Sequence, residues 1–463
     1  MKTNLIEWAR VRRYPMSLSL AASALVVGCA VPPEQSSSYP PAPAAATPSA
    51  QVYAPSPSTS SPSSAAVAQA PSSAAPAAAA PSSPAPSAPT AAAAPPPPPP
   101  VLPYDQAVLN AANALLGGAQ LAGGDSAKYT LVIDPLIDGV TGMQSNATRS
   151  MGERLVKLIQ EKYPRFDVQR FSASNVSKSP LVLIGTFTGV NAQRQTAGVR
   201  EAYRICFALA DLKTGKLVSK GLAFAQTDGV DATPITYFQD APAWTEDPAT
   251  LGYIRTCQGT KPGDPINPLY VDRVLTGATI SEGIDAYNAG RYKESLELFE
   301  NALNSPQGNQ LRVYNGLYLA NWKLGRRAAA AESFGKVVDF GVQNKRLATK
   351  FLFRPGTTAF FSDPAVSGPY PIWLKEIASR TSTANVCLEI TGHTSATGPA
   401  PLNERLSALR AEYVKKRLET EAPLLVKRTI ANGVGSRENM VGNGRDDATD
   451  ALDRRVEFKV IGC

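Results

Sequence analysis

The sequence predicts an α+β fold made of several domains, because stretches with different residue patterns follow one another along its 463 residues. A long segment rich in proline, alanine and serine comes early and can bury no core. Residues 104–227 alternate between strand-like and helix-like apolar patterns, and residues 276–345 contain a helical repeat. Residues 346–463 combine an amphipathic helix with short apolar strands.

Residues 1–28 have the layout of an export signal. Basic residues begin the segment, and residues 16–27 form an apolar run that is too short to span a membrane. The run ends at Gly28-Cys29 in a sequence that resembles a bacterial lipobox. This resemblance implies cleavage before Cys29, attachment of lipid, including palmitate, to that cysteine, and a place in the outer membrane facing the periplasm. The alternative is an ordinary signal peptide or a membrane anchor with a chance cysteine.

Residues 29–103 are predicted to be a disordered linker. From residue 31 onward the segment holds 22 of the 40 prolines and a single charged side chain, Glu34. Proline favours extended polyproline II at about 3 Å per residue, so the linker could span on the order of 200 Å. We interpret it as a spacer between a lipid and a binding domain. Disorder without a mechanical role is the alternative.

A small α/β domain is predicted for residues 104–227. Apolar runs of strand length surround a segment at 147–163, where apolar residues recur at helical spacing. The last two runs flank Lys213-Thr214-Gly215, which is typical of a hairpin turn. The predicted strands are residues 129–134, 166–171, 180–190, 203–212 and 216–225.

Residues 228–275 are rich in proline, aspartate, threonine and glycine, which predicts a long surface connection stapled only by Cys257. Four cysteines remain beyond the lipobox, and an even number in an exported protein suggests two disulfides. The domain layout favours the pairs Cys206 with Cys257 and Cys387 with Cys463. Free buried thiols are the alternative.

Residues 276–345 contain an internal repeat with a period of 35 residues. Tyr287, Gly290, Ser295, Phe299 and Ala302 recur as Trp322, Gly325, Ala330, Phe334 and Val337. The period, with glycine at the turn and small or aromatic residues at packing positions, resembles the tetratricopeptide repeat. Two repeats are too few for independent stability, so we expect them to pack on a neighbouring domain. A groove for a protein partner is one interpretation, and a structural spacer is the other.

Three short motifs follow one another in residues 346–463. They are Gly392-His393-Thr394-Ser395, Asn403-x-x-Leu406-Ser407-x-x-Arg410-Ala411 and Asp453-Arg454-Arg455-Val456-Glu457. Their order is similar to that of the OmpA-like C-terminal family, which binds peptidoglycan. The resemblance implies a βαβ-type sandwich of helices on a mixed sheet. It places a first strand at 352–354, helices at 371–379 and from Asn403 onward, and a second strand at 386–391.

The same resemblance implies where a ligand binds. In the family, the arginine that matches Arg410 holds the carboxylate of diaminopimelate in the peptidoglycan stem peptide, a task that suits a planar guanidinium. The family usually has aspartate where this chain has Ser395, so the ligand's ammonium group meets a hydroxyl instead of a charge. Acids that could substitute are Asp446, Asp447, Asp450 and Asp453. The predicted ligand-binding residues are Thr394, Ser395, Asn403, Leu406, Arg410 and Arg455.

Alternatives stay open at two of these residues. Asn403 could be a helix N-cap, and Arg410 could form an internal salt bridge. His393, the only histidine, is predicted to be structural, with its ring hydrogen-bonded at the strand end. We therefore expect no metal and no cofactor. The core-facing stripe of the main helix is predicted as Leu406, Leu409, Tyr413, Val414 and Arg417.

Charge and composition argue against several functions. The formal charge of +8 falls by three when the signal, with four basic residues and one acidic residue, is removed, which is too little for a nucleic-acid-binding protein. No nucleophile with a base and no carboxylate pair stands out, so we do not expect an enzyme. The sequence predicts an outer-membrane lipoprotein that binds peptidoglycan and tethers the membrane to the wall. The alternative is a periplasmic regulatory or scaffold lipoprotein whose other domains bind a cell-wall enzyme or a secretion component.

Overall fold

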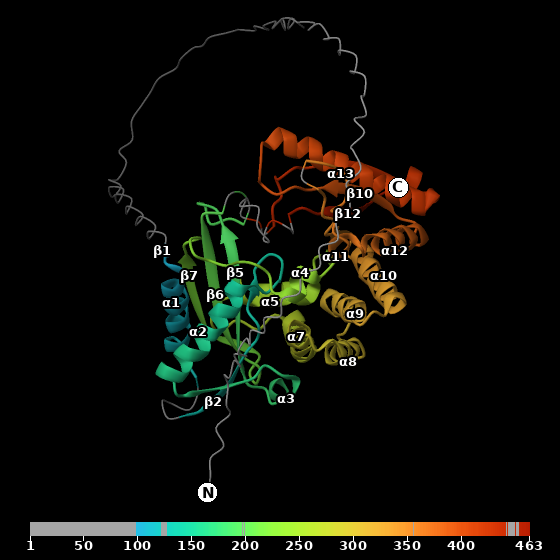
Figure 1. Ribbon diagram of the computed structural model, residues 1–463. Helices are drawn as coiled ribbons and strands as arrows, with labels where there is room; N and C mark the ends of the chain where they lie inside the picture. Colours follow the sequence, from blue (N-terminus) through green and yellow to red (C-terminus); the bar gives the residue numbers. More distant parts are fainter. Residues whose placement is uncertain are drawn as a thin grey trace, which may run out of the picture. The chain divides into compact units, whose positions relative to one another are not determined.

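The computed structural model describes residues 99–121, 127–196, 198, 200–354, 356–440, 442, 450 and 453–463. Two mixed sheets and their helices make up this part of the chain (Figure 1). The predicted signal, the lipidation site Cys29 and nearly all of the predicted linker lie outside the described residues. Among the described helices, none has both the length and the apolar character needed to cross a membrane.

The five apolar runs that the sequence marks as strands all lie in the first sheet, which also contains two short strands that were not predicted, β1 and β3. β2 runs parallel to β4 and β5, while β5, β6 and β7 form an antiparallel meander. The order is β1-β7-β6-β5-β2-β4, and β3 pairs with β5. The strands are β1 (Val101–Leu102), β2 (Tyr129–Ile133), β3 (Ile137–Asp138), β4 (Phe166–Gln169), β5 (Leu181–Val190), β6 (Ala202–Asp211) and β7 (Lys216–Ala225).

One face of this sheet is covered by α1 (Tyr104–Gly117) and α2 (Asn146–Lys162). α2 begins with a capping box, in which the side chains of Ser145 and Thr148 each accept a hydrogen bond from the other's backbone N–H. Met151 and the other apolar residues of its inner face are buried in the core, and each such side chain contributes roughly 1.5–3 kcal/mol.

The opposite face of the sheet is covered by helices from residues 228–275, which were predicted to form a surface connection. α5 (Pro248–Cys257) and α6 (Pro268–Val271) pack on this face and bury Tyr253 and Tyr270. Two of the prolines that suggested a loop, Pro248 and Pro268, stand at the first positions of these helices. A proline is tolerated there because that N–H has no partner inside the helix.

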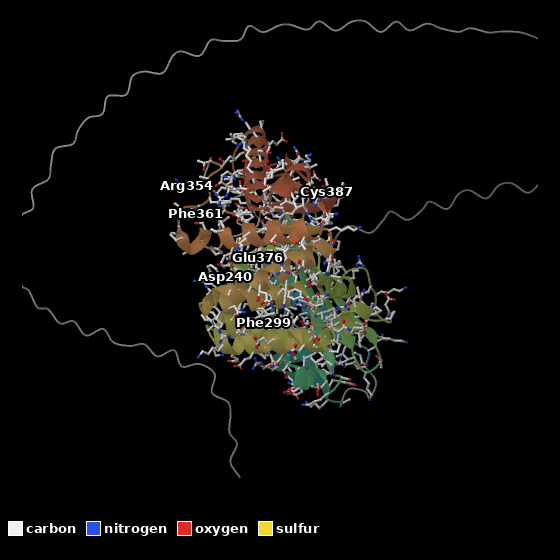
Figure 2. The ribbon with its side chains drawn as sticks, turned by 90° about the vertical axis from the view of Figure 1, so that its right-hand side faces the viewer. Asp240, Phe299, Arg354, Phe361, Glu376 and Cys387 are labelled. Atoms are coloured by element: carbon white, nitrogen blue, oxygen red, sulfur yellow. A yellow bond between two sulfur atoms is a disulfide. The ribbon has the colours of Figure 1, made fainter. Side chains whose placement is uncertain are left out.

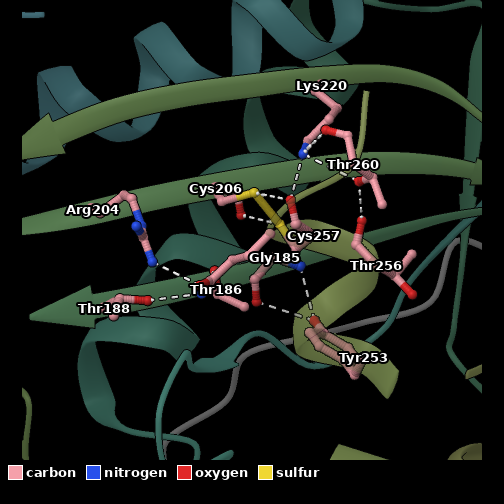
Figure 3. Close-up of a disulfide and its surroundings, with 11 residues drawn as sticks. Gly185, Thr186, Thr188, Arg204, Cys206, Lys220, Tyr253, Thr256, Cys257 and Thr260 are labelled. Atoms are coloured by element: carbon pink, nitrogen blue, oxygen red, sulfur yellow. Dashed lines mark hydrogen bonds between the residues drawn. A yellow bond between two sulfur atoms is a disulfide. The ribbon is translucent and has the colours of Figure 1, made fainter. Parts of the chain in front are cut away.

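Both predicted disulfides are present, so these four cysteines are not free thiols. Cys206 on β6 bonds Cys257 at the end of α5 and fastens that helix to the sheet (Figure 3). The backbone oxygen of Cys257 also accepts a hydrogen bond from Lys220 Nζ at 2.5 Å. The second disulfide joins Cys387 to Cys463, the last residue.

Two helical hairpins follow. They consist of α7 (Val274–Asn288) with α8 (Tyr292–Leu303) and of α9 (Leu311–Lys323) with α10 (Arg327–Gln343). Gly290 and Gly325 lie at the two turns with φ of +74° and +75°, a conformation that favours glycine. The 35-residue period therefore places a left-handed glycine at the same point of each hairpin.

A short helix of the chain itself lies against these hairpins. α4 (Thr236–Asp240) contacts both α7 and α9. The ring of Tyr237 stacks on Phe299 and meets Tyr287 edge-on, each at 5.8 Å between centroids, and its hydroxyl donates to the Arg312 carbonyl at 2.5 Å. The side of the hairpins formed by α7 and α9 is therefore covered by α4, which belongs to the segment between the first sheet and the repeats.

The second sheet has the order β11-β10-β12-β9-β8. β8 comes from the stretch predicted as a connection and pairs antiparallel with β9. Helix α10 packs on α12, where Phe334 stacks on Trp373 at 5.6 Å, so the hairpins and the second sheet share one core. The elements are β8 (Ala243–Trp244), β9 (Arg346–Thr349), α11 (Pro364–Ser367), α12 (Tyr370–Thr383), β10 (Cys387–Gly392), α13 (Ala400–Glu421), η1 (Pro423–Lys427), β11 (Thr429–Gly433) and β12 (Val456–Ile461).

The predicted first strand of this sheet is wrong in position. β9 ends at Thr349, and residues 351–361 form a narrow hairpin closed by a bridge between Phe353 and Phe360. The aromatic rings explain the difference, because Phe351 packs on Phe360 at 5.5 Å inside the core instead of continuing the strand.

The predicted core-facing stripe of α13 is turned about the helix axis relative to the face that is buried. Leu409 is 48% exposed and Arg417 is also exposed, while Ser407, Ala411 and Leu418 face the core together with the correctly predicted Val414. Small and polar residues are needed on this face, because the ends of two strands press against it closely.

Candidate functional site

The candidate site lies where β10 and β11 end against the first half of α13. Two glycines permit the contact: a Cβ on Gly392 would lie 2.1 Å from the Ser407 carbonyl oxygen, and one on Gly433 would lie 2.3 Å from the Ala408 nitrogen. The buried Ser407 hydroxyl accepts a hydrogen bond from the Gly435 N–H at 2.9 Å. The strand ends and the helix therefore meet backbone to backbone.

Thr394 and Ser395 come one residue after the end of β10 and are only 3% and 5% exposed. The Thr394 N–H donates to the Gly435 carbonyl at 2.8 Å, but its hydroxyl oxygen has no hydrogen-bond partner among the described residues. The Ser395 hydroxyl lies 2.9 Å from that of Thr397. The site thus holds one paired and one unpaired hydroxyl where the sequence predicts ligand contacts.

Asn403 is not a helix N-cap, because α13 begins three residues earlier at Ala400. Its side-chain nitrogen donates toward the carbonyls of Ser395, Thr397 and Gly398 at 3.1–3.4 Å. The buried amide therefore holds the loop that carries Ser395 in place.

Arg410 is the charged group of the site and is 5% exposed. Its Nε donates to the Thr357 carbonyl at 3.1 Å, its Nη2 donates to the Arg354 carbonyl at 3.2 Å, and its guanidinium lies over the Phe353 ring at 4.8 Å. Burial lowers the pKa of Arg410 to about 10, helped by the charge of Arg454, so the side chain stays protonated at neutral pH. Within the described chain no carboxylate pairs with Arg410, so the internal salt bridge is not found there.

The partners of Arg410 were missed in the sequence because they are backbone atoms. Its two acceptors lie near the tip of the 351–361 hairpin, in which Arg354 and Phe361 are labelled in Figure 2. The Arg354 N–H donates to Ala359 and the Phe361 N–H donates to Leu352, both at 2.9 Å. The available signal was the run of phenylalanines in this stretch, which is typical of a buried hairpin.

Arg455 lies in a separate buried network centred on Glu457. Its Nε and Nη2 both lie 2.7 Å from Glu457 Oε1, and Arg346 bonds both oxygens of the same carboxylate. Burial acts to raise the pKa of Glu457, but the charges of Arg455 and Arg346 outweigh it and lower that pKa. The predicted ligand contact through Arg455 therefore meets a guanidinium already paired inside the protein.

The charge of the neighbouring arginine, Arg454, acts on Arg410 instead. Leu406, the other predicted contact on α13, is half-buried. The structure thus brings Thr394, Ser395 and Asn403 together, while Arg410 stands two helical turns further along, at roughly 10 Å.

His393 is structural in a different way from that predicted. Its ring is 2% exposed, and neither nitrogen has a hydrogen-bond partner among the described residues. Nε2 lies 3.7 Å from Glu457 Oε1. Burial, followed by the charge of Arg455, lowers the pKa of His393 to about 3, so the ring is neutral.

Two of the acids that could replace the missing aspartate are occupied inside the protein. Asp450 and Asp453 are fully buried, and the Asp453 carboxylate accepts hydrogen bonds from the Met440 and Gly442 backbone at 2.5 and 2.8 Å. Asp446 and Asp447 lie outside the described residues. In the described chain no group of three or more His, Cys, Asp and Glu side chains is placed to hold a metal ion.

No protein-family model matches the chain, and no curated protein matches it. Similar solved structures cover about a fifth to a third of it. The peptidoglycan-associated lipoprotein from Burkholderia pseudomallei is 25% identical over 22% of this chain and 85% of its own, with a TM-score of 0.20. The cell wall anchor of the T6SS from Pseudomonas aeruginosa is 23% identical over 26% and 81%, with a TM-score of 0.22. A putative MotB-like protein from Desulfovibrio vulgaris is 20% identical over 32% and 98%, with a TM-score of 0.22. At these TM-scores the similarities carry no argument about function.

Proposed function

We propose that residues 346–463 bind peptidoglycan non-covalently and without catalysis, and that the chain tethers the outer membrane to the cell wall through a lipid on Cys29. The motif order around Gly392 and Arg410 supports the ligand class. The observation that carries the proposal is the buried guanidinium of Arg410, whose described partners are uncharged carbonyls.

A buried cation gains most from a carboxylate, because charged hydrogen bonds are roughly twice as strong as neutral ones. The Nη1 of Arg410 makes no hydrogen bond with another described residue, which leaves it as the nitrogen that we propose a ligand carboxylate approaches. The unpaired Thr394 hydroxyl oxygen is buried, so it is closed to a ligand in this structure.

The alternative function is a regulatory protein whose repeats bind a partner. It is weakened because part of the repeat surface that a partner could use is already covered. α4 lies against α7 and α9, so a partner would have to displace residues that are packed in the core or bind elsewhere. We therefore keep the tether as the proposed function.

The test is co-sedimentation of the mature full-length chain with isolated sacculi. We expect Arg410→Ala to lose at least a decade of affinity, because a charge-assisted hydrogen bond contributes about 1.5–3 kcal/mol. Arg410→Lys should retain part of the binding, since the charge remains. A soluble stem peptide containing diaminopimelate should compete with the sacculi.

The matched control is Arg417→Ala, which removes an exposed arginine from the same helix. Circular dichroism of each variant separates lost binding from lost folding. The proposal is wrong if a folded Arg410→Ala variant sediments like the wild type, or if Arg417→Ala weakens binding equally.

A further inference from the structure

A pocket of about 370 Å³ lies away from the residues of the Arg410 site. It is formed where the start of α5, the residue before α7, the connection between α8 and α9, and the end of α10 meet. Small-molecule sites typically have volumes of roughly 300–1,000 Å³, so the pocket has room for a ligand of one or two rings. Nothing in the proposed tether function uses it.

Side-chain amides dominate the lining of this pocket. Gln307, Asn309, Gln343 and Asn344 all contribute, and an amide offers both donors and an acceptor. Asn344 donates to the Phe340 carbonyl at 2.8 Å, and the Asn309 oxygen accepts from a tyrosine hydroxyl at 3.1 Å. The side chains of Gln307 and Gln343 form no hydrogen bond with another described residue. Several donors and acceptors are therefore available to a ligand.

The charges that line the pocket cancel. Arg273 contributes one cation and Asp247 one carboxylate. Asp247 is 4% exposed, and its two oxygens accept hydrogen bonds from the Ala249 and Leu311 backbone at 2.9 and 3.0 Å. Burial raises the pKa of Asp247, while the charges of Arg312 and Arg273 act to lower it. A strongly charged ligand would therefore find no net attraction.

The remaining lining is apolar and small in extent. Pro248 and Pro306 are exposed, and Phe340, which also lines the pocket, is almost fully buried. A pyranose ring combines these same properties: hydroxyl groups around its rim that exchange hydrogen bonds with amides, and C–H groups on its faces that contact apolar rings.

We propose that this pocket binds a neutral saccharide of one or two pyranose rings. Calorimetric titration of the mature full-length chain with N-acetylglucosamine, chitobiose and cellobiose tests this. Comparing the two acetylated sugars with cellobiose, which has no acetyl group, shows whether the pocket requires the N-acetyl group. We expect binding of at least one at millimolar concentrations. The double variant Gln307→Ala/Asn309→Ala should weaken it by about tenfold, the loss of one or two neutral hydrogen bonds.

Asn304→Ala is the matched control, because Asn304 is an exposed amide at the end of α8 that does not line the pocket. Arg410→Ala should bind the sugar like the wild type, so failure at one site is distinguishable from failure at the other. Absence of heat with all three sugars overturns the proposal, as does unchanged binding by the folded double variant.

Discussion

The guanidinium of Arg346 on β9 forms a two-pronged ion pair with the carboxylate of Glu457 on β12, with distances of 2.9 and 3.0 Å. The two residues are 111 positions apart in the sequence and lie on adjacent strands. Arg455 bonds the same carboxylate from the other side. A buried acid between two arginines contributes stability only while all its partners are present.

Replacing Glu457 by glutamine should therefore lower the free energy of unfolding by about 3–5 kcal/mol, because Arg455 would be left buried without its counter-charge. Urea denaturation at pH 7 measures this. The control is Glu389→Gln on the neighbouring strand, whose partly exposed pair with Lys459 spans 4.0 Å and should contribute less than about 1 kcal/mol. Equal losses in the two variants would contradict the network.

The stability of the protein should fall as the pH drops below 6.5, because His393 cannot take up a proton when folded. Its pKa is lowered to about 3, while the unfolded chain is protonated from about 6.5 downward. Between these values the unfolded state binds more protons, so the free energy of unfolding decreases by roughly 1.4 kcal/mol per pH unit. His393→Phe should remove this slope between pH 6.5 and 5. The same slope in the variant would show that another group causes it.

Changing Ser395 to aspartate should strengthen binding to sacculi by roughly one to two decades, since a charged hydrogen bond contributes about 1.5–3 kcal/mol. Ser395→Asn is the matched control, similar in size but without charge. If neither variant changes the affinity, another group already neutralises the ligand's ammonium.

Residues 346–463 alone should be less stable than residues 99–463. The cut would remove β8 from the sheet edge and expose Trp373, which stacks on Phe334 and donates to the Tyr318 hydroxyl at 2.9 Å. A lower melting temperature and stronger binding of a hydrophobic dye are expected of the short fragment. A short fragment as stable as the longer one would mean that the shared core contributes nothing.

Five of the seven described strands of the first sheet could be predicted from the sequence because their apolar runs are continuous and end at turn residues, whereas β1 and β3, of two residues each, were not predicted. β5, for example, is buried along its whole length, and its pattern requires no knowledge of its neighbours. The helices α5 and α6 could not be predicted in this way. Their prolines suggest a loop until the surrounding sheet shows that they mark helix starts.

In the candidate site, too, local features could be predicted from the sequence and contacts with distant segments could not. The motifs place Thr394, Asn403 and Arg410 near one another, because strand end and helix are local features. The sequence says nothing of the Arg354 and Thr357 carbonyls that Arg410 contacts, since those are backbone atoms of a hairpin some 50 residues away. It also does not show that Arg455 pairs with Glu457, because strand alternation alone does not tell which side of the strand each arginine of the Arg454-Arg455 pair faces.

The Cys387–Cys463 bond has a mechanical consequence. It joins the beginning of β10 to the residue just after β12, and these two strands run antiparallel side by side. Both strands lie within the loop that this disulfide closes. A pull on Cys463 therefore passes through the sulfur–sulfur bond to Cys387 and on to the chain before β10, so the β10–β12 hydrogen bonds carry little of the force while the disulfide is intact.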